Sequence, residues 1–155
     1  MKQRLAVVAV LLATLGSLSR GYQNGAPKDA CVSMFPRHQA EAQTSPSPYN
    51  IILNTATYTP GSNNTVAVLL TSPQQTFAGV LVEARSAADC GNTNPIGTFL
   101  LATNERDLQL LSCMAAGDAV TQKSSLLKAT SKVFLWHPPV QSSGPVYFRA
   151  TVVKS

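Results

Sequence analysis

The chain has 155 residues, which fits a single domain, and 45% of them are hydrophobic while 12% are charged. Its formal net charge is +5, but Lys2, Arg4 and Arg20 lie within the first 21 positions, and without them nine basic residues remain against seven acidic ones. The remaining cations are scattered along the chain, so the charge pattern does not indicate nucleic-acid binding.

Residues 1–21 predict a removable secretory signal. Lys2 and Arg4 precede a mostly apolar run from Leu5 to Gly16, and small residues that suit signal peptidase follow it. The run is shorter than the roughly 20 residues that a membrane-spanning helix needs, and no later stretch approaches that length. We therefore expect a secreted, extracellular protein without a membrane span, whose mature domain covers residues 22–155.

The stretch from residue 22 to residue 51 has no helical or strand period until its end. It contains four prolines, which remove backbone donors and favour extended conformations: Pro27, Pro36, Pro46 and Pro48. We expect this segment to run along the edge of a sheet, with Met34 and Phe35 at the margin of the core. Covering a sheet edge in this way also protects it against aggregation.

Seven short runs, separated by turn residues, then predict β-strands. They lie at residues 49–58, 65–71, 77–85, 96–102, 108–114, 132–137 and 145–153. Residues 77–85 are apolar on both faces up to Glu83 and Arg85, which is typical of a central strand. No stretch predicts an amphipathic helix. The pattern indicates an all-β fold, an immunoglobulin-like antiparallel β-sandwich of seven to eight strands.

Alternation of apolar and polar residues predicts which strand faces are buried. Residues 49, 51 and 53 form one apolar face of their run, and the period of two places residues 66, 68 and 70 inward. In the last run, the predicted buried positions are Val146, Phe148, Ala150 and Val152.

Catalytic and metal-binding motifs are missing from the sequence. There is no nucleophile elbow, phosphate-binding glycine loop or zinc-ligand spacing, and the two histidines, His38 and His137, are far apart. Trp136 could stack on a sugar ring, although a tryptophan at the end of a strand more often belongs to the core. We therefore expect no enzyme, no metal site and no cofactor.

A set of motifs in order along the chain resembles the reeler (reelin-type) domain. The set begins with "GAPKDAC", Met34, Pro36 and His38, and continues through "YTPG", "FAGVLVEAR", "IGTF", "LLSC", "VTQKSS", "KVFLWHPP" and "PVYFRATVV". The chain departs from the family at Val80, where phenylalanine is usual, at Gln122, where histidine is common, and in its extra cysteine, Cys90. A family ligand that depended on that histidine is therefore in question here.

The resemblance carries functional expectations. Single-domain secreted reeler proteins resemble an insect group linked to innate immunity and antibacterial responses. The resemblance therefore implies a defense protein that binds microbial surface components, such as polysaccharide or lipopolysaccharide, and has antimicrobial activity. The alternative is an extracellular matrix or adhesion module with a structural or interaction role. Reeler domains also precede haem and membrane modules in ferric-chelate reductase-like proteins, and this sequence contains no such modules.

The three cysteines allow three pairings in an oxidising compartment. Loop entropy separates them weakly, at about 4.6 kcal/mol for residues 31–113 and about 3.4 for 90–113. Cys31 lies in the segment that needs anchoring, and Cys113 ends an apolar run. Both also fall on recurrent positions of the reeler family. We therefore expect a Cys31–Cys113 disulfide and a Cys90 thiol that is free or forms an intermolecular link in a dimer.

One glycosylation sequon is present. Asn63-Asn64-Thr65 follows a Pro-Gly turn, where a glycosyltransferase can reach it. Asn63 is therefore a candidate for N-glycosylation, and an unmodified turn residue is the equal alternative.

Overall fold

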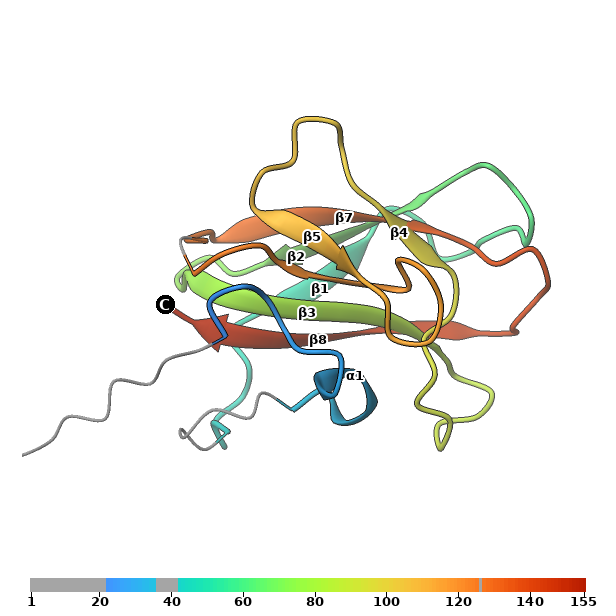
Figure 1. Ribbon diagram of the computed structural model, residues 1–155. Coiled ribbons are helices and arrows are strands. Elements are labelled where there is room, and N and C mark those ends of the chain that lie inside the picture. Colours follow the sequence, from blue (N-terminus) through green and yellow to red (C-terminus); the bar gives the residue numbers. More distant parts are fainter. Residues whose placement is uncertain (1–21, 36–41, 126) are drawn as a thin grey trace, which may run out of the picture.

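The computed structural model describes residues 22–35, 42–125 and 127–155, so the expected signal at residues 1–21 and His38 lie outside the described part. Eight strands form two four-stranded antiparallel sheets (Figure 1). The expectation of an antiparallel β-sandwich is confirmed. No helix among the described residues is long and apolar enough to cross a membrane.

The strand order mixes elements from distant parts of the chain. The first sheet has the order β1-β2-β7-β4, with β1 at Asn50–Leu53, β2 at Val66–Thr71, β7 at Ser131–His137 and β4 at Thr98–Leu100. The second sheet has the order β5-β6-β3-β8, with β5 at Leu108–Leu111, β6 at Ala119–Gln122, β3 at Phe77–Ser86 and β8 at Val146–Lys154.

The main core lies between the two sheets. Alternate residues of β2 are buried there, as the period of two predicts: Val66, Val68 and Leu70. Alternate residues of β3 meet them from the other sheet: Val80, Val82 and Ala84. Trp136, 1% exposed, fills one end of this core and makes edge-to-face contacts with Tyr58 and Phe148.

Strand β6 is the element that the sequence pattern did not reveal. All four of its residues are buried, although two of them, Thr121 and Gln122, are polar. A polar pair of this kind looks like a loop in sequence. It can be buried because its side chains find hydrogen-bond partners in other segments.

Residues 22–35, which we call the covering segment, add a third layer to the sandwich. The segment lies over the outer face of β3 and its neighbours, and its middle forms a one-turn helix, α1 (Ala30–Ser33), that ends at Met34 with a φ of 55° (Figure 1). The expectation of an extended segment along a sheet edge is therefore wrong for residues 22–35. These residues include a helical turn, and they lie over the face of the sheet. Met34 is buried as expected, whereas Phe35 is 46% exposed.

The covering segment explains why neither face of β3 is exposed. Residues 80, 82 and 84 point into the main core, and the intervening Leu81, Glu83 and Arg85 are buried on the opposite face. By contrast, β8 is an edge strand. Its core-facing residues, from Val146 to Val152, pack against the main core but remain partly exposed, so the expectation of full burial was too strong. On β1, an edge strand of the first sheet, Leu53 is 40% exposed.

Candidate functional site

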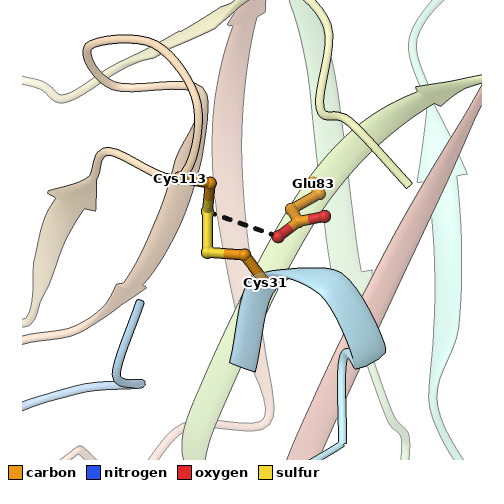
Figure 2. Close-up of side chains that lie close together, drawn as sticks. All are labelled: Cys31, Glu83 and Cys113. Atoms are coloured by element: carbon orange, nitrogen blue, oxygen red, sulfur yellow. Dashed lines mark hydrogen bonds between the residues drawn. A yellow bond between two sulfur atoms is a disulfide. The ribbon is translucent and has the colours of Figure 1, made fainter. Parts of the chain in front are cut away.

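One disulfide fastens the covering segment to the sandwich. It joins Cys31 in α1 to Cys113, just after β5, across a sequence separation of 82 residues (Figure 2). The two Cα atoms are 5.9 Å apart, within the usual range for a disulfide. Both cysteines are buried, whereas Cys90 is exposed on the loop after β3. The covering segment is thus tied covalently at its only helical turn among the described residues.

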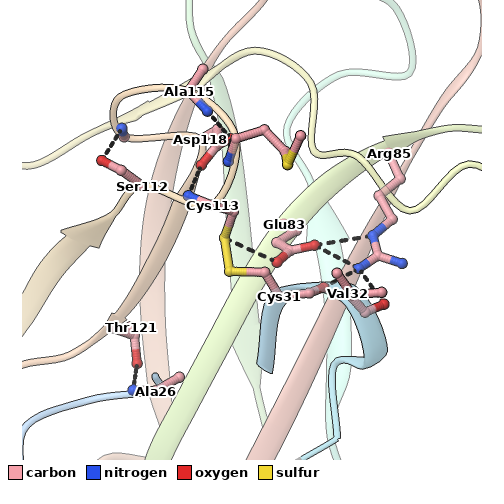
Figure 3. The surroundings of a disulfide bond; sticks show 12 residues. Ala26, Cys31, Val32, Glu83, Arg85, Ser112, Cys113, Ala115, Asp118 and Thr121 are labelled. Atoms are coloured by element: carbon pink, nitrogen blue, oxygen red, sulfur yellow. Dashed lines mark hydrogen bonds and ion pairs between the residues drawn. A yellow bond between two sulfur atoms is a disulfide. The ribbon is translucent and has the colours of Figure 1, made fainter. Parts of the chain in front are cut away.

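The loop that carries Cys113 is held by a buried carboxylate. Asp118 accepts hydrogen bonds from the backbone N–H groups of Cys113, Met114 and Ala115, at 2.7 to 2.8 Å (Figure 3). A carboxylate that receives several backbone donors can remain buried without a cationic partner. The loop therefore presents Cys113 in a fixed position toward α1.

A buried ion pair lies beneath the same helical turn. Glu83 and Arg85, two residues apart on β3, are joined by a 2.8 Å contact and are 0% and 1% exposed. Arg85 also donates to the backbone carbonyls of Cys31 and Val32 (Figure 3). These bonds satisfy carbonyl groups that so short a helix leaves without partners. The ion pair is thus a second, non-covalent anchor for the covering segment.

Burial shifts the pKa of the Glu83 carboxyl group upward. Removal of its carboxyl group from water raises the pKa to about 6, although the neighbouring Arg85 guanidinium lowers it. Its Oε1 atom lies 3.5 Å from Cys113 Sγ (Figure 2). Cys31, Glu83 and Cys113 could together offer three ligand atoms within 4.8 Å of one another. In the oxidised state, however, the two sulfurs are bonded to each other and Arg85 faces the carboxylate, so the group does not fit a cation.

A cavity of about 300 Å³ lies between the covering segment and the second sheet. One wall consists of residues of the covering segment: Ala26, Pro27, Ala30 and Met34. The other wall consists of residues from β3 and β8: Ala78, Gly79, Leu81, Thr151 and Val153. Tyr22 and Phe35, which are 45% and 46% exposed, also line it, and so does Lys154 at the end of β8. We call this space the cover cavity.

Gln122, where the family commonly has histidine, lines the cover cavity. Its Oε1 accepts hydrogen bonds from the Val80 N–H and the Thr121 hydroxyl, both at 2.9 Å, and its Nε2 donates to the Tyr22 carbonyl at 3.3 Å. The amide thus bridges β3, β6 and the covering segment. Both ends of the side chain are occupied, so its role in this chain is to hold the cavity walls together.

Close approach of the covering segment to the sheet depends on one glycine. Gly25 has a φ of 94°, and a Cβ atom there would lie 2.5 Å from both the Gln109 Nε2 and the Gln122 carbonyl oxygen. Any other residue would collide with these atoms and would be strained at this φ. The Ala26 N–H then donates to the Thr121 hydroxyl at 2.8 Å (Figure 3).

A second cavity, of about 310 Å³, lies beside the aromatic end of the main core. Tyr58, Trp136 and Phe148 contribute to its lining. Trp136 is almost completely buried and its indole N–H donates to the Ile96 carbonyl at 2.8 Å. Its ring therefore packs in the core and does not offer a free face to a sugar.

The other residues singled out in the sequence lie apart from the cover cavity. Asn63 is exposed in the loop between β1 and β2, and Cys90 is exposed in the loop between β3 and β4. His137 is half-buried at the end of β7, where it pairs with Thr98. Among the described residues, no hydrogen bond joins His137 to a serine and a carboxylate.

Sequence reasoning missed the Glu83–Arg85 anchor and the cover cavity. The signal for the anchor was present, because two charged residues of opposite sign at a spacing of two lie on one face of a strand. Their position inside an otherwise apolar run indicated a covered face. The cavity left no such signal, because its walls come from three separate parts of the chain.

Comparisons with known proteins agree with this architecture. Residues 29–155 match the Reeler domain family. The chain is 36% identical over 153 residues to a Bombyx mori protein named "Putative defense protein", covering 97% of this chain and 86% of that one. It is 34% identical over 145 residues to "Putative defense protein Hdd11" of Hyphantria cunea, covering 92% and 85%.

Two further similarities place the domain in other settings. Human ferric-chelate reductase 1 is 34% identical over 134 residues, which are 86% of this chain and 21% of that protein. The crystal structure of the human F-spondin reeler domain superposes with a TM-score of 0.56 at 23% identity, covering 69% of this chain and 78% of that one. The similarity to the F-spondin structure concerns the fold alone.

Proposed function

The chain belongs to the reeler domain family, and we propose that it is a secreted defense protein that binds components of microbial surfaces. The observation that carries this proposal is the similarity to insect relatives named for defense, which extends over 97% of this chain and 86% of the Bombyx mori relative. A match over 97% of this chain spans the strands, the covering segment and the positions of both bridged cysteines. We further propose that binding leads to antimicrobial activity.

The geometry supports binding rather than catalysis. The cover cavity is lined mainly by apolar side chains, and the buried ion pair Glu83–Arg85 is sealed beneath α1. An apolar cavity with few polar groups is the usual form of a small-ligand site. The ferric-chelate reductase relative is several times longer than the segment it shares with this chain, so its name does not transfer to the domain alone.

Two features support the proposed secretion. A disulfide of wide sequence separation forms and persists in oxidising compartments. Together with the signal expected at residues 1–21, this supports an extracellular location. The proposed protein acts outside the cell, where microbial polysaccharide and lipopolysaccharide are accessible to it.

A pull-down assay tests the proposed function. The purified protein is incubated with intact bacteria, with insoluble fungal β-glucan and with immobilised lipopolysaccharide, and bound protein is measured after washing. We expect saturable retention on at least one microbial surface, and reduced growth of the bacteria that retain it. Retention on extracellular matrix from uninfected tissue, without retention on any microbial surface, would instead support a structural or adhesive module.

Expression provides a second, independent measurement. A defense protein should be induced after bacterial challenge, whereas a matrix component should stay at a constant level. Transcript abundance before and after challenge separates the two functions without purified protein. An unchanged transcript combined with no microbial retention would overturn the proposal.

A further inference from the structure

We propose that the cover cavity binds the acyl chain of an anionic amphiphile, whose head group lies beside Lys154. This inference deepens the proposed function and rests on it for its biological meaning, because acylated anionic molecules are exposed components of microbial surfaces. It assigns a ligand class to a cavity bounded by α1, β3 and β8.

The cavity walls are suited to an alkyl chain. Ala26, Pro27 and Met34 face Leu81 and Val153 across the space, and these side chains have no polar atoms that a hydrocarbon would leave without hydrogen bonds. Among the polar lining side chains, Gln122 and Thr151 have their hydrogen-bonding groups engaged, with Tyr22 and Val80 and with the Met34 carbonyl respectively, while the hydroxyl-bearing Tyr22 and Ser125 are exposed. At about 300 Å³, the cavity has the size of a small ligand site.

Charge indicates the nature of the head group. Lys154 is the one charged residue among the described lining residues, and no acidic side chain accompanies it. It forms no ion pair within the described part of the chain. The backbone of Lys154 is fixed beside the cavity, because Lys154 pairs with Phe77 at the end of β8 and the Ser155 N–H donates to the Thr76 carbonyl at 3.3 Å. A carboxylate or phosphate is complementary to this cation.

The cavity is held open by bonds that do not depend on a ligand. The Cys31–Cys113 disulfide, the Arg85 bonds to the α1 carbonyls and the Ala26–Thr121 bond fix the covering segment above the sheet. A site held in its binding conformation does not lose further chain entropy when the ligand enters. The cavity opens to solvent beside the exposed Tyr22 and Phe35, so an alkyl chain can enter it from the surface.

Gly79 and Val153 suggest how to block the site selectively. A Cβ atom on Gly79 would lie 3.0 Å from the Val153 Cβ, so these two residues form one tight part of the wall. Val153→Phe on half-buried β8 would place a ring in the cavity. Val133→Phe is the matched control, because Val133 is 51% exposed on β7 of the other sheet and outside the lining.

Fluorescence titration tests the proposal. The delipidated secreted protein is titrated with 11-(dansylamino)undecanoic acid, and dodecanoate and dodecanol compete for the site. We expect saturable binding with one site per chain, displacement by dodecanoate, and at least threefold weaker displacement by dodecanol. Val153→Phe should weaken binding at least tenfold, whereas Val133→Phe should leave it unchanged. Absence of saturable binding to the wild-type protein, or equal loss in both variants, would overturn the proposal.

A second pair of variants tests the head-group position. Lys154→Glu should weaken dodecanoate at least threefold without changing dodecanol, while Arg106→Glu, the same charge change on the β4–β5 loop, should change neither. If Val153→Phe fails to show a cooperative melting transition, Ala78→Leu on β3 is measured in its place, because Ala78 lines the same cavity. Unchanged binding in the folded cavity-filling variant would refute the site.

The outcome is distinguishable from that of the proposed function. Retention on microbial surfaces by both wild type and Val153→Phe, without fatty-acid binding, would refute the acyl site and leave the function standing. Fatty-acid binding without microbial retention would refute the function and support the site for free fatty acids. Competition by diacyl phosphatidylglycerol vesicles separates membrane lipid from free fatty acid as the source of the chain.

Discussion

Glu83 and Arg85 lie two residues apart on β3 and form a 2.8 Å ion pair that is sealed from solvent beneath α1. The pair lies on the outer face of its sheet, where a two-layer sandwich would expose it to water. It is buried because the covering segment forms a third layer, and it stabilises that layer through the Arg85 bonds to the Cys31 and Val32 carbonyls. The folded position of the first described residues therefore depends on charges in the middle of the chain.

The raised pKa of Glu83 predicts a pH dependence of stability. Burial raises the pKa to about 6 from an ordinary value of 4.5, so the folded state holds this proton more tightly than the unfolded state. The stability that the proton contributes is fully present below pH 4.5 and is lost as the pH rises through 6. The difference between the two pKa values corresponds to about 2 kcal/mol.

Glu83→Gln isolates this contribution because glutamine does not titrate. We expect the wild-type free energy of unfolding, measured relative to that of Glu83→Gln by urea denaturation, to fall by about 2 kcal/mol between pH 4 and pH 7. A constant difference between the two proteins over this range would show that Glu83 is not shifted in the folded state.

The disulfide is expected to be a major contribution to stability. Closing the loop between residues 31 and 113, which are 82 positions apart, corresponds to about 4.6 kcal/mol in the chain-entropy model, and measured losses are about 2–5 kcal/mol. Replacing both Cys31 and Cys113 with alanine should therefore lower the free energy of unfolding by about 2–5 kcal/mol in denaturant titrations. Cys90→Ser, the control, should change it by less than about 0.5 kcal/mol.

Exposure of Cys90 predicts selective chemical reactivity. Its side chain is solvent-accessible, whereas the other two sulfurs are bonded to each other and buried. Native protein treated with iodoacetamide should carry one label, located on Cys90 by peptide mapping without reduction. A Cys90-linked dimer would carry none until reduced. An intramolecular disulfide that contains Cys90 is the result that would contradict the structure.

Packing on β8 predicts unequal effects for neighbouring residues. Phe148 is half-buried and its ring lies edge to face with Trp136 at 5.4 Å, so Phe148→Ala should cost about 2–3 kcal/mol, below the range for fully buried phenylalanines. Arg149 points away from the core and is exposed, and Arg149→Ala should cost less than about 1 kcal/mol. Thermal melts of the two variants compare them directly, and equal losses would reverse the assigned strand faces.

Asn63 is a further site that can be tested on the secreted protein. It is exposed in the β1–β2 loop, within the sequence Asn63-Asn64-Thr65. Expression in eukaryotic cells should give a protein whose mass falls on treatment with an N-glycosidase. Asn63→Gln should abolish that change, whereas Asn64→Gln leaves the sequon intact and should not. Identical masses before and after treatment of the wild-type protein would exclude modification at this residue.

The sequence by itself determined the class of fold and most of its strands. Residues 66, 68 and 70 alternate with a period of two because one face of β2 packs on the opposite sheet, and this burial leaves a visible pattern. A set of short motifs, which occur along the chain in the same order as in the reeler family, also indicated that family. The polar loop around Cys90, together with the family positions of Cys31 and Cys113, indicated which two cysteines form the disulfide.

Only the tertiary structure decided how the covering segment packs and where the cover cavity forms. Thr121 and Gln122 look like loop residues in sequence, yet they form buried β6, because partners from β3 and the covering segment satisfy their polar groups. The covering segment lies over a sheet face and not along an edge, because Arg85 and the disulfide hold α1 there. The cover cavity arises between surfaces that are distant in the chain, and local sequence patterns carry no record of such long-range packing.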